Sequence, residues 1–411
     1  MRKTLFAAAL AAIAASAMGA DPATIDWSKV PASAVTLFYP GQSSYEWLRN
    51  DHKKGKGAKA VANGQACVRC HEDEEKDLGA SLVKGGPLEP APVKGKPGSV
   101  ELKVQAAYDE KNAYLRFQWR TAADRPGTNY PSYRFDGAEW KVHGAPKLDQ
   151  VVREGKQPGI YEDRLSIMLD DGKVPDFARQ GCWVSCHDGS RDMPNAASKD
   201  QAQAAIKKDD VRKYLPASRT NPQDWRTVKS AEEIAKVKAA GGFLDLVQWR
   251  AHRSNPVGAA DDGFVLEHRN FDAGKNPFAS NLDAKTKLPR FMFAPGKKGE
   301  FLTQGENAVA FDPKAGWKQG DMLPRYFLQR AEGSAADNKA SGTWKNGEWT
   351  VVLVRPLALA NADDKALREG GVYNVGFAVH DDNITTRGHH VSFVRTLGIG
   401  AAADIRAVKL P

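Results

Sequence analysis

The feature that most constrains this chain of 411 residues is the short motif Cys67-Val68-Arg69-Cys70-His71. Its C-x-x-C-H pattern is typical of the covalent attachment of c-type haem. Two thiols at this spacing reach the two vinyl groups on one edge of the macrocycle, and the next histidine then lies under the iron as proximal ligand. A bare C-x-x-C pair would also fit a redox dithiol or half of a zinc site. The adjacent histidine and the lack of a matching second C-x-x-C pair argue against both.

A second motif, Cys182-Trp183-Val184-Ser185-Cys186-His187, contains one more residue between its cysteines. The alternative interpretation is a local disulfide in an oxidising compartment, with the histidine incidental. Because the Cys-His dipeptide is intact and the first motif is complete, we expect a second covalent haem, with the extra residue bulging out of the attachment loop. The sequence therefore predicts two c-type haems, attached at Cys67, Cys70, Cys182 and Cys186, with His71 and His187 as proximal iron ligands.

Other histidines and one methionine are candidates for the sixth ligand of each iron. His52 precedes the first motif in a loop rich in lysine and glycine, where a solvated side chain is the alternative. Leu165, Ile167 and Leu169 share one face of a predicted strand. Met168 therefore lies on the other face, where it either points at the second haem or packs against another layer. A third group of candidates, on two late predicted strands, consists of His380, His389 and His390.

Residues 1–20 are typical of a secretory signal peptide, because Arg2 and Lys3 precede an apolar, alanine-rich stretch that ends in small residues. That stretch is too short to anchor the chain in a bilayer, and no other segment has the ~18 uninterrupted apolar residues of a membrane span. We therefore expect a periplasmic protein without stable membrane insertion. Basic and acidic residues are mixed along the chain, whose formal charge is +9, which argues against a basic stripe for nucleic-acid binding.

From residue 99 onward the pattern predicts strands. Alternating residues in 112–119 form a hairpin with 100–108, and further strand-like runs include 342–354, with an Asn-Gly turn. The clearest helix is 230–240, which begins with a capping box, and a second covers roughly 199–214. Further predicted strands are 163–169, 243–250, 263–268, 307–311, 372–380 and 389–397.

These elements predict a mainly β protein in three parts. Residues 1–20 are the signal peptide. Residues 21–98 form a small, mostly irregular or helical segment that carries the first c-type haem and ends in a Pro/Gly-rich linker. Residues 99–411 form an antiparallel β-sandwich that binds haem, with the second motif in one of its long insertions.

Several stretches resemble the haem-binding domain shared by the gamma subunits of ethylbenzene dehydrogenase and dimethyl sulfide dehydrogenase and by related periplasmic cytochromes. The resemblance implies a β-sandwich that holds haem at one end and exchanges electrons with a molybdenum enzyme or another respiratory partner. In those gamma subunits a methionine and a lysine hold a b-type haem without cysteines. Met168 matches the methionine, and Cys182, Cys186 and His187 suggest that a histidine replaces the lysine, as in a dihaem c-type branch. The matching stretches are 104–109, 112–119, 163–168, 377–382 and 387–393.

Electron transfer between redox protein partners is the function that these features favour, because the chain offers more candidate sixth ligands than haems. We therefore expect no catalysis. The alternatives are a haem enzyme such as a dihaem peroxidase, which needs an open iron position with acid–base residues over it, and a haem-based sensor or binding module. The sequence contains no recognisable pairing of nucleophile and base, and it leaves the oligomeric state open.

Charged residues flank the first motif. The acidic run Glu72-Asp73-Glu74-Glu75 follows it, and lysines crowd the loop before it. One interpretation is a charge-split surface on which a partner docks over the haem edge. The other is a solvated helix start beside a flexible loop. The lysines are Lys53, Lys54, Lys56 and Lys59.

Overall fold

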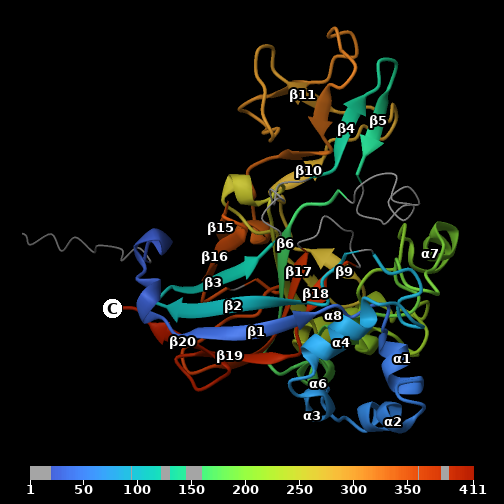
Figure 1. Cartoon of the computed structure of the whole chain (residues 1–411), viewed down its shortest axis with the longest axis vertical. Helices are drawn as coiled ribbons and strands as arrows, with labels where there is room; N and C mark the ends of the chain where they lie inside the picture. The colour runs from blue at the N-terminus through green and yellow to red at the C-terminus, as the bar shows by residue number, and fades with distance from the viewer. Residues whose placement is uncertain (1–19, 94, 122–129, 145–159, 360, 381–387) are drawn as a thin grey trace, which may run out of the picture.

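The computed structural model describes residues 20–93, 95–121, 130–144, 160–359, 361–380 and 388–411, so the predicted signal peptide lies almost entirely outside the described residues. The described chain is mainly β, as predicted, and a sheet of 13 strands dominates it (Figure 1). Most neighbouring strands are antiparallel. Helices gather at one end of this sheet, and the chain continues into a smaller β extension at the other (Figure 1).

The strands of the main sheet, in the order in which they pair, are β15 (Lys339–Lys345), β16 (Glu348–Pro356), β3 (Asn112–Arg120), β2 (Ser99–Tyr108), β1 (Ala32–Phe38), β18 (His390–Val391), β17 (Val372–His380), β6 (Arg164–Asp170), β7 (Leu244–Arg250), β8 (Gly263–Val265) and β9 (Arg269–Phe271). Two more strands, β19 (Arg395–Ile399) and β20 (Ile405–Lys409), connect β17 back to β2, and β20 pairs in parallel with both of its neighbours. The sheet thereby folds back on itself.

The two halves of this folded sheet enclose the main hydrophobic core. Phe117 of β3 packs against Phe377 of β17, with ring centroids 5.8 Å apart. Trp249 of β7 packs against Trp119 of β3 and Trp349 of β16 at 5.9 and 4.7 Å. Each large apolar side chain buried in this way stabilises the fold by roughly 1.5–3 kcal/mol. The alternating strand patterns therefore do produce a sandwich-like core.

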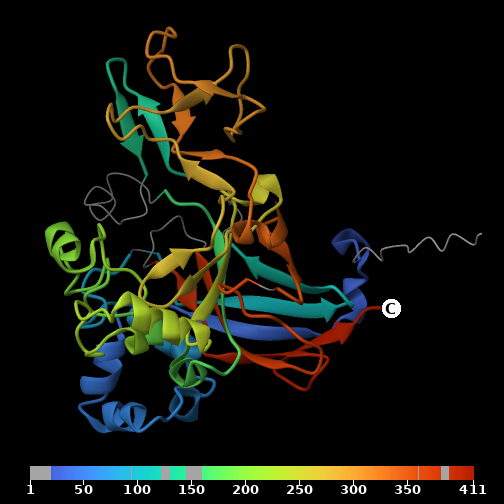
Figure 2. The same cartoon turned by 180° about the vertical axis from the view of Figure 1, so that it is seen from behind.

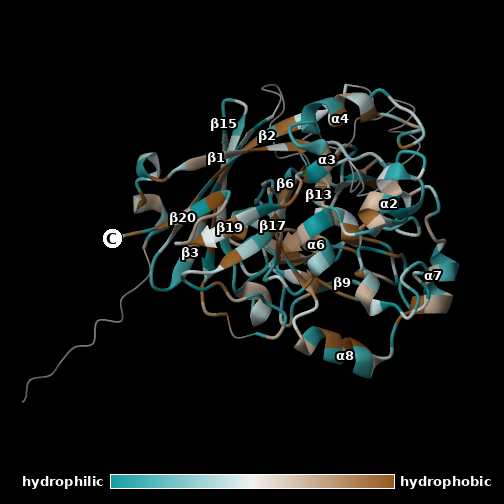
Figure 3. Cartoon of the chain, turned by 90° about the horizontal axis from the view of Figure 1, so that it is seen from below, coloured by the Kyte–Doolittle hydropathy of each residue, from teal (hydrophilic) through white to brown (hydrophobic). Residues whose placement is uncertain are grey.

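Local sequence signals place several elements correctly. The hairpin of β15 and β16 turns at Asn346 and Gly347, whose φ angles of 53° and 79° match the twist of the flanking strands. Helix α8 (Ala231–Ala239) begins with the predicted capping box and carries both apolar and polar residues (Figure 3). Helix α7 (Lys199–Ile206) is shorter than predicted, because Lys207 adopts a left-handed conformation that ends it.

The N-terminal segment is mostly helical or irregular, as expected, but it also contains one strand. Strand β1 pairs with β2 over its full length, from Ala32 opposite Gln105 to Phe38 opposite Ser99. It then leads into α1 (Tyr45–Asn50), α2 (Lys56–Ala62), α3 (Val68–His71) and α4 (Glu75–Leu82), which lie near α6 (Pro175–Gln180) at one end of the sheet (Figure 1). The segment before residue 98 thus contributes a strand to the main sheet.

The extension at the opposite end consists of small sheets, which stand off the main sheet in both views (Figure 2). The predicted strand at 307–311 belongs here. No helix among the described residues combines the length and apolarity needed to cross a bilayer. The strands of the extension are β4 (Ser132–Phe135), β5 (Trp140–His143), β10 (Phe278–Ser280), β11 (Phe291–Phe293), β12 (Ala308–Ala310), β13 (Met322–Pro324) and β14 (Tyr326–Leu328).

Candidate functional site

The first cysteine motif forms the single helical turn α3. The backbone N–H groups of Cys70 and His71 both donate to the carbonyl of Cys67, at 3.1 Å, which brings the three functional side chains of the motif into one turn. Cys67 is half-buried and Cys70 exposed, and neither forms a disulfide. Burial raises the pKa of the Cys67 thiol to about 11. Redox-active dithiols have a lowered thiol pKa, so this pair does not fit that alternative.

His71 is oriented as a metal ligand would be. Its Nδ1 lies 2.7 Å from Oε2 of Glu74, and a carboxylate in that position fixes the tautomer that leaves Nε2 available for a metal. The ring of His52 lies opposite, with centroids 5.8 Å apart and planes inclined by 27°. Burial, together with His71 and Lys53, lowers the pKa of His52 and so favours the neutral imidazole that binds metals. The structure therefore brings these two predicted ligands together.

The second motif occupies the 3₁₀ turn η3 (Gly181–Ser185), which accommodates its extra residue. Gly181 has a φ of 58°, a left-handed conformation that favours glycine where the chain leaves α6. Cys182 is buried and Cys186 half-buried, and no disulfide joins the two. Burial raises the pKa of Cys182 to about 11, which again does not fit a redox dithiol.

His187 is fully buried and held by contacts on both ring nitrogens. Its Nδ1 lies 2.7 Å from Oε1 of Glu46 in α1, and its Nε2 lies 3.0 Å from the backbone carbonyl oxygen of Tyr214. The imidazole also stacks on the Tyr214 ring, with centroids 3.6 Å apart. Burial is the largest single influence and raises the pKa of Glu46, but the hydrogen bond and charge of His187 together with the backbone N–H of Asp188 outweigh it and leave that pKa lowered. Iron ligation through Nε2 would replace its contact with the Tyr214 carbonyl oxygen.

A cavity of about 370 Å³ lies beside the second motif. Both Cys182 and Cys186 line it, and Met168 projects into it from β6, away from the core that its neighbours fill. The prediction that Met168 lies on the opposite face from Leu165 and Ile167 is therefore confirmed. Of the late histidines, His380 and His389 line the cavity and stack on each other at 5.0 Å. His390 is not among the lining residues, and its Nε2 lies 2.8 Å from the carbonyl oxygen of Pro97.

Lys213 also lines this cavity, although no motif of the sequence marks it. Its Nζ lies 3.2 Å from Sγ of Cys186 and 3.5 Å from Oγ of Ser185. The expected helix over 199–214 would have placed it on a helical face, whereas the chain is already irregular at this point. The family resemblance implied a ligand lysine but did not place it at any position of this sequence.

The rim of the cavity is strongly basic. Arg250 forms an ion pair with Asp261, as Arg269 also does, and Arg253 pairs with Glu162. Arg164 differs, because its side chain is 5% exposed while its Nε and Nη2 have no hydrogen-bond partner among the described residues. The remaining arginines that line this cavity are Arg191 and Arg212.

The guanidinium of Arg164 lies over the Tyr161 ring, 4.7 Å from its centroid, and forms no ion pair with an acid among the described residues. It indicates the kind of ligand that fits the cavity. Burial, followed by the neighbouring Arg250 and Arg253, lowers the pKa of Arg164 well below its usual value. A buried cation without a partner is unfavourable, so this position calls for an anion. Haem combines an apolar macrocycle with carboxylate side chains. It therefore fits a cavity with Met168 in its wall and a guanidinium at its edge.

The two motifs lie against each other, although 115 positions separate Cys67 from Cys182. The N–H of Cys67 donates to the carbonyl of Arg179 at 3.1 Å. Aromatic rings also connect the motifs. The ring centroid of Phe393 lies 6.4 Å from that of His71 and 5.9 Å from that of Trp183, the residue after Cys182. Cys67 and Trp183 also belong to one hydrophobic cluster. Both candidate sites therefore form one continuous region.

Comparison with known proteins agrees with this arrangement. The family model of ethylbenzene dehydrogenase matches residues 24–392. The chain is similar to cytochrome c-552 of Stutzerimonas stutzeri, with 32% identity over 414 aligned residues that cover 100% of both proteins. It is also similar to cytochrome c-551 of Rhodocyclus tenuis, with 30% identity over 220 residues, 53% of this chain and 73% of that protein. The chain belongs to the ethylbenzene dehydrogenase family.

Proposed function

We propose that this protein is an electron-transfer cytochrome with two covalently attached c-type haems, one at each cysteine–histidine motif. The observation that carries the proposal is a feature shared by both motifs. In each, the histidine after the second cysteine has a carboxylate on its Nδ1, from Glu74 for His71 and from Glu46 for His187. Metal-ligating histidines are typically held in this way. The similar proteins named cytochrome c-552 and cytochrome c-551 support haem as the cofactor.

Each site has its own set of proposed ligands. In the first, His71 is the proximal ligand and His52 the sixth. In the second, His187 is proximal and Met168 is the sixth ligand, while Arg164 balances a haem carboxylate. Haem supplies a one-electron iron couple whose potential depends on these axial ligands. The other side chains that could take the sixth position in the second site are His380, His389 and Lys213, which all line the cavity.

Electrons would pass between the two sites within one chain. Phe393 and Trp183 bridge the motifs, and Phe38 stacks on Trp183 at 5.6 Å. Such packed aromatic side chains exclude water from the space between two redox centres. We therefore propose that the protein relays electrons internally and is not itself an enzyme.

Redox proteins of the periplasm are the partners that we propose. The family resemblance favours a molybdenum oxidoreductase as one of these partners. The other would be a second electron-carrying protein. The export of the chain rests on the signal-peptide pattern of residues 1–20.

Haem stoichiometry tests the proposal. The mature wild-type protein should carry two covalent haems by intact mass and by haem-stained denaturing gel electrophoresis. The double variant Cys182→Ala/Cys186→Ala should lose the mass of one haem and still stain, and Cys67→Ala/Cys70→Ala should behave in the same way. The variant Ser190→Ala, beside the second motif, is the control and should retain both. If the haem mass of the Cys182→Ala/Cys186→Ala variant is unchanged, the second site carries no attached haem.

A further inference from the structure

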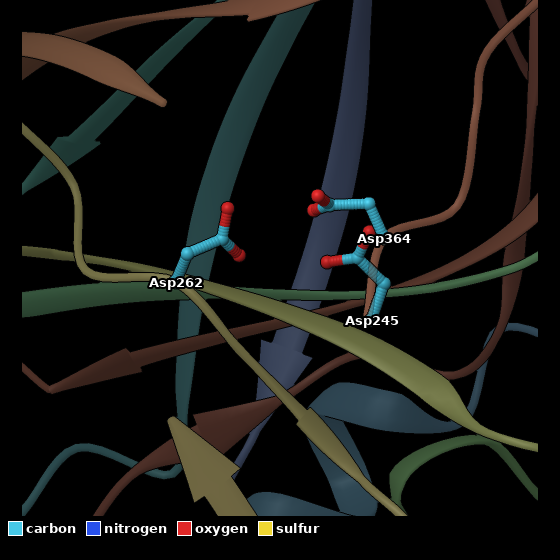
Figure 4. Close-up of side chains that lie close together, drawn as sticks. All are labelled: Asp245, Asp262 and Asp364. Atoms are coloured by element: carbon cyan, nitrogen blue, oxygen red, sulfur yellow. The ribbon is translucent and has the colours of Figure 1, made fainter. Parts of the chain in front are cut away.

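Five buried aspartates cluster outside the haem cavity, where β7, the segment before β8 and the loop between β16 and β17 meet. Figure 4 shows three of them, with the carboxylate of Asp262 facing those of Asp245 and Asp364. Burying this many carboxylates together is unfavourable unless other groups neutralise them. The exposed fractions are 1% for Asp245, 0% for Asp262, 5% for Asp272, 8% for Asp363 and 8% for Asp364.

The cluster consists of two triads that share Asp364. Each triad offers one oxygen per residue, and the three oxygens lie within 4.8 Å of one another. Two oxygens bound to one ion at about 2.4 Å each can be separated by no more than about this distance. The first triad is Asp245, Asp262 and Asp364, and the second is Asp272, Asp363 and Asp364.

The first triad already has a cation. The guanidinium of Arg355, 2% exposed, contacts Asp245 through Nη2, and it lies 3.4 Å from Asp364 and 4.0 Å from Asp262. The amide of Asn338 donates a further hydrogen bond to Asp262. One guanidinium and these hydrogen bonds therefore occupy the space between the three carboxylates.

In the second triad only the shared residue Asp364 lies close to this guanidinium among the described residues. Neither Asp272 nor Asp363 forms an ion pair with a lysine or arginine there. Asp363 is hydrogen-bonded by the hydroxyl of Ser334 at 3.0 Å and by the N–H of Ala273 at 3.2 Å. Both carboxylate oxygens of Asp272 are buried without any hydrogen-bond partner. Burial, followed by Asp363 and Asp245, raises the pKa of Asp272 to about 8, so the neighbouring Arg355 does not compensate for the burial of this carboxylate.

Backbone hydrogen bonds join the surrounding loops, and a hollow that Lys238 also lines lies beside them. Lys275 and Glu332 exchange two backbone hydrogen bonds of 2.9 Å, which tie the loop of Asp272 to that of Ser334. Gly274 makes the close approach possible, because a Cβ there would lie 2.0 Å from the carbonyl oxygen of Glu332. A hollow of about 490 Å³ borders Asp363 and Ser334 and provides access for an ion and its water ligands.

We propose that Asp272, Asp363 and Asp364 bind a calcium ion. Calcium takes six to eight oxygen ligands, from carboxylates, hydroxyls, carbonyls and water, in a flexible geometry. The triad supplies carboxylate oxygens only, without the thiolate or imidazole that zinc and copper prefer. The hollow beside Asp363 leaves room for water ligands. The ion would hold the loop after β9 against the loop between β16 and β17, and so lock the edge of the main sheet.

Calcium binding to the haem-loaded full-length mature protein tests this proposal. After treatment with EDTA and desalting, equilibrium dialysis with metal analysis should find about one calcium per chain, with a dissociation constant between roughly 10⁻⁶ and 10⁻³ M. Saturating calcium should raise the thermal midpoint by about 2–5 °C, because it binds the folded state alone. Magnesium at the same concentration should raise it less, since it demands octahedral geometry and dehydrates reluctantly.

Variants of the triad show where the ion binds. They also show whether calcium or a bound proton neutralises the triad. Asp272→Asn should weaken calcium binding by at least about tenfold and abolish the thermal shift. Asp337→Asn is the matched control, because it removes a neighbouring acid outside both triads, and it should bind calcium as the wild type does. Should Asp272→Asn fold poorly, Asp363→Asn provides the same comparison.

Two results would overturn the proposal. The first is a wild-type protein that binds no calcium at millimolar concentration while Asp272→Asn is as stable or more stable, since the amide mimics a protonated carboxyl group. The second is calcium binding that persists in both Asp272→Asn and Asp363→Asn, because the ion would then lie elsewhere.

Discussion

Met168 illustrates how far a single residue can be located from sequence. Because side chains alternate along a strand, a methionine between two leucine or isoleucine positions has to face the other layer. The structure places it in the cavity with Cys182 and Cys186, on the opposite face from Leu165 and Ile167. The alternation predicts the direction of the side chain, although it does not predict what fills the cavity.

Replacing Met168 tests its role as an iron ligand. Met168→His should lower the potential of one haem by on the order of 0.1 V, because methionine ligation raises haem potentials and axial ligands set them over roughly 0.8 V. Spectroelectrochemical titration measures the change, and Met193→His is the control, since Met193 is also buried but does not line the cavity. A normal spectrum and potential in Met168→Ala would exclude Met168 and favour His380 or His389.

Other residues of the two sites were beyond sequence reasoning. Glu46 lies 141 positions from His187, so no local pattern connects them. Arg164 is one of many arginines, and only its burial without a partner distinguishes it. By contrast, the cysteines and their adjacent histidines carry their chemistry within five or six consecutive residues. Motifs of this kind are recognisable because covalent attachment dictates their spacing.

At the scale of elements, helix α2 shows how one glycine positions a ligand. A Cβ at Gly57 would lie 2.9 Å from Nδ1 of His52, closer than such atoms approach each other. The helix can therefore pack against the imidazole only because this position has no side chain. Glycine inside a helix is otherwise unfavourable by roughly 0.5–1 kcal/mol relative to alanine, so its presence here is consistent with a need for space.

The variant Gly57→Ala separates the effect of helix propensity from the effect of the space that the His52 ring needs. If His52 binds the first iron, the variant should lose its low-spin signature or change its potential despite its better helix propensity, and electronic absorption and paramagnetic resonance spectra measure this. Lys59→Ala, an exposed position on the same helix, should leave both unchanged. An unchanged spectrum together with higher thermal stability in Gly57→Ala would show that His52 is not a ligand.

Strands and helices with strong local signals were predictable, and those defined by distant contacts were not. Capping residues and an Asn-Gly turn correctly placed α8 and the hairpin of β15 and β16. Strand β1 was missed, although Val35 and Leu37 enter the core on alternate positions, because its signal is short. Its place in the sheet depends on β2, whose pairing with it no local pattern reveals.

At the scale of the whole molecule, the predicted charge-split docking surface changes. Glu75 is 6% exposed and forms an ion pair with Arg395 at 3.1 Å, and Glu74 is hydrogen-bonded to His71. Glu75 is therefore used inside the protein, whereas Glu72, Asp73 and Glu74 remain exposed. The four lysines before the motif are exposed as well, and this basic half of the surface suits an acidic partner.

Salt dependence tests this basic surface. Reduction by an acidic flavodoxin should slow several-fold as the ionic strength rises, because screening acts over a Debye length of roughly 8–10 Å. Replacing Lys53, Lys54, Lys56 and Lys59 with glutamine should flatten this dependence in stopped-flow measurements without changing the haem spectrum. Replacing Lys285, Lys287, Lys297 and Lys298 of the distant extension is the control. Equal salt dependence in both variants would place docking elsewhere.

The contacts between the two ends of the chain also determine the order in which the protein can be assembled. The first motif is enclosed by Arg179, by Phe393 and, through Glu75, by Arg395, which all follow it by more than 100 positions. Contacts between such distant segments form late in folding, because closing long loops is entropically unfavourable. If haem is attached at this motif as proposed, the thiols of Cys67 and Cys70 would stay accessible to the attachment machinery until the last strands arrive. Folding would then enclose a centre that already carries its haem.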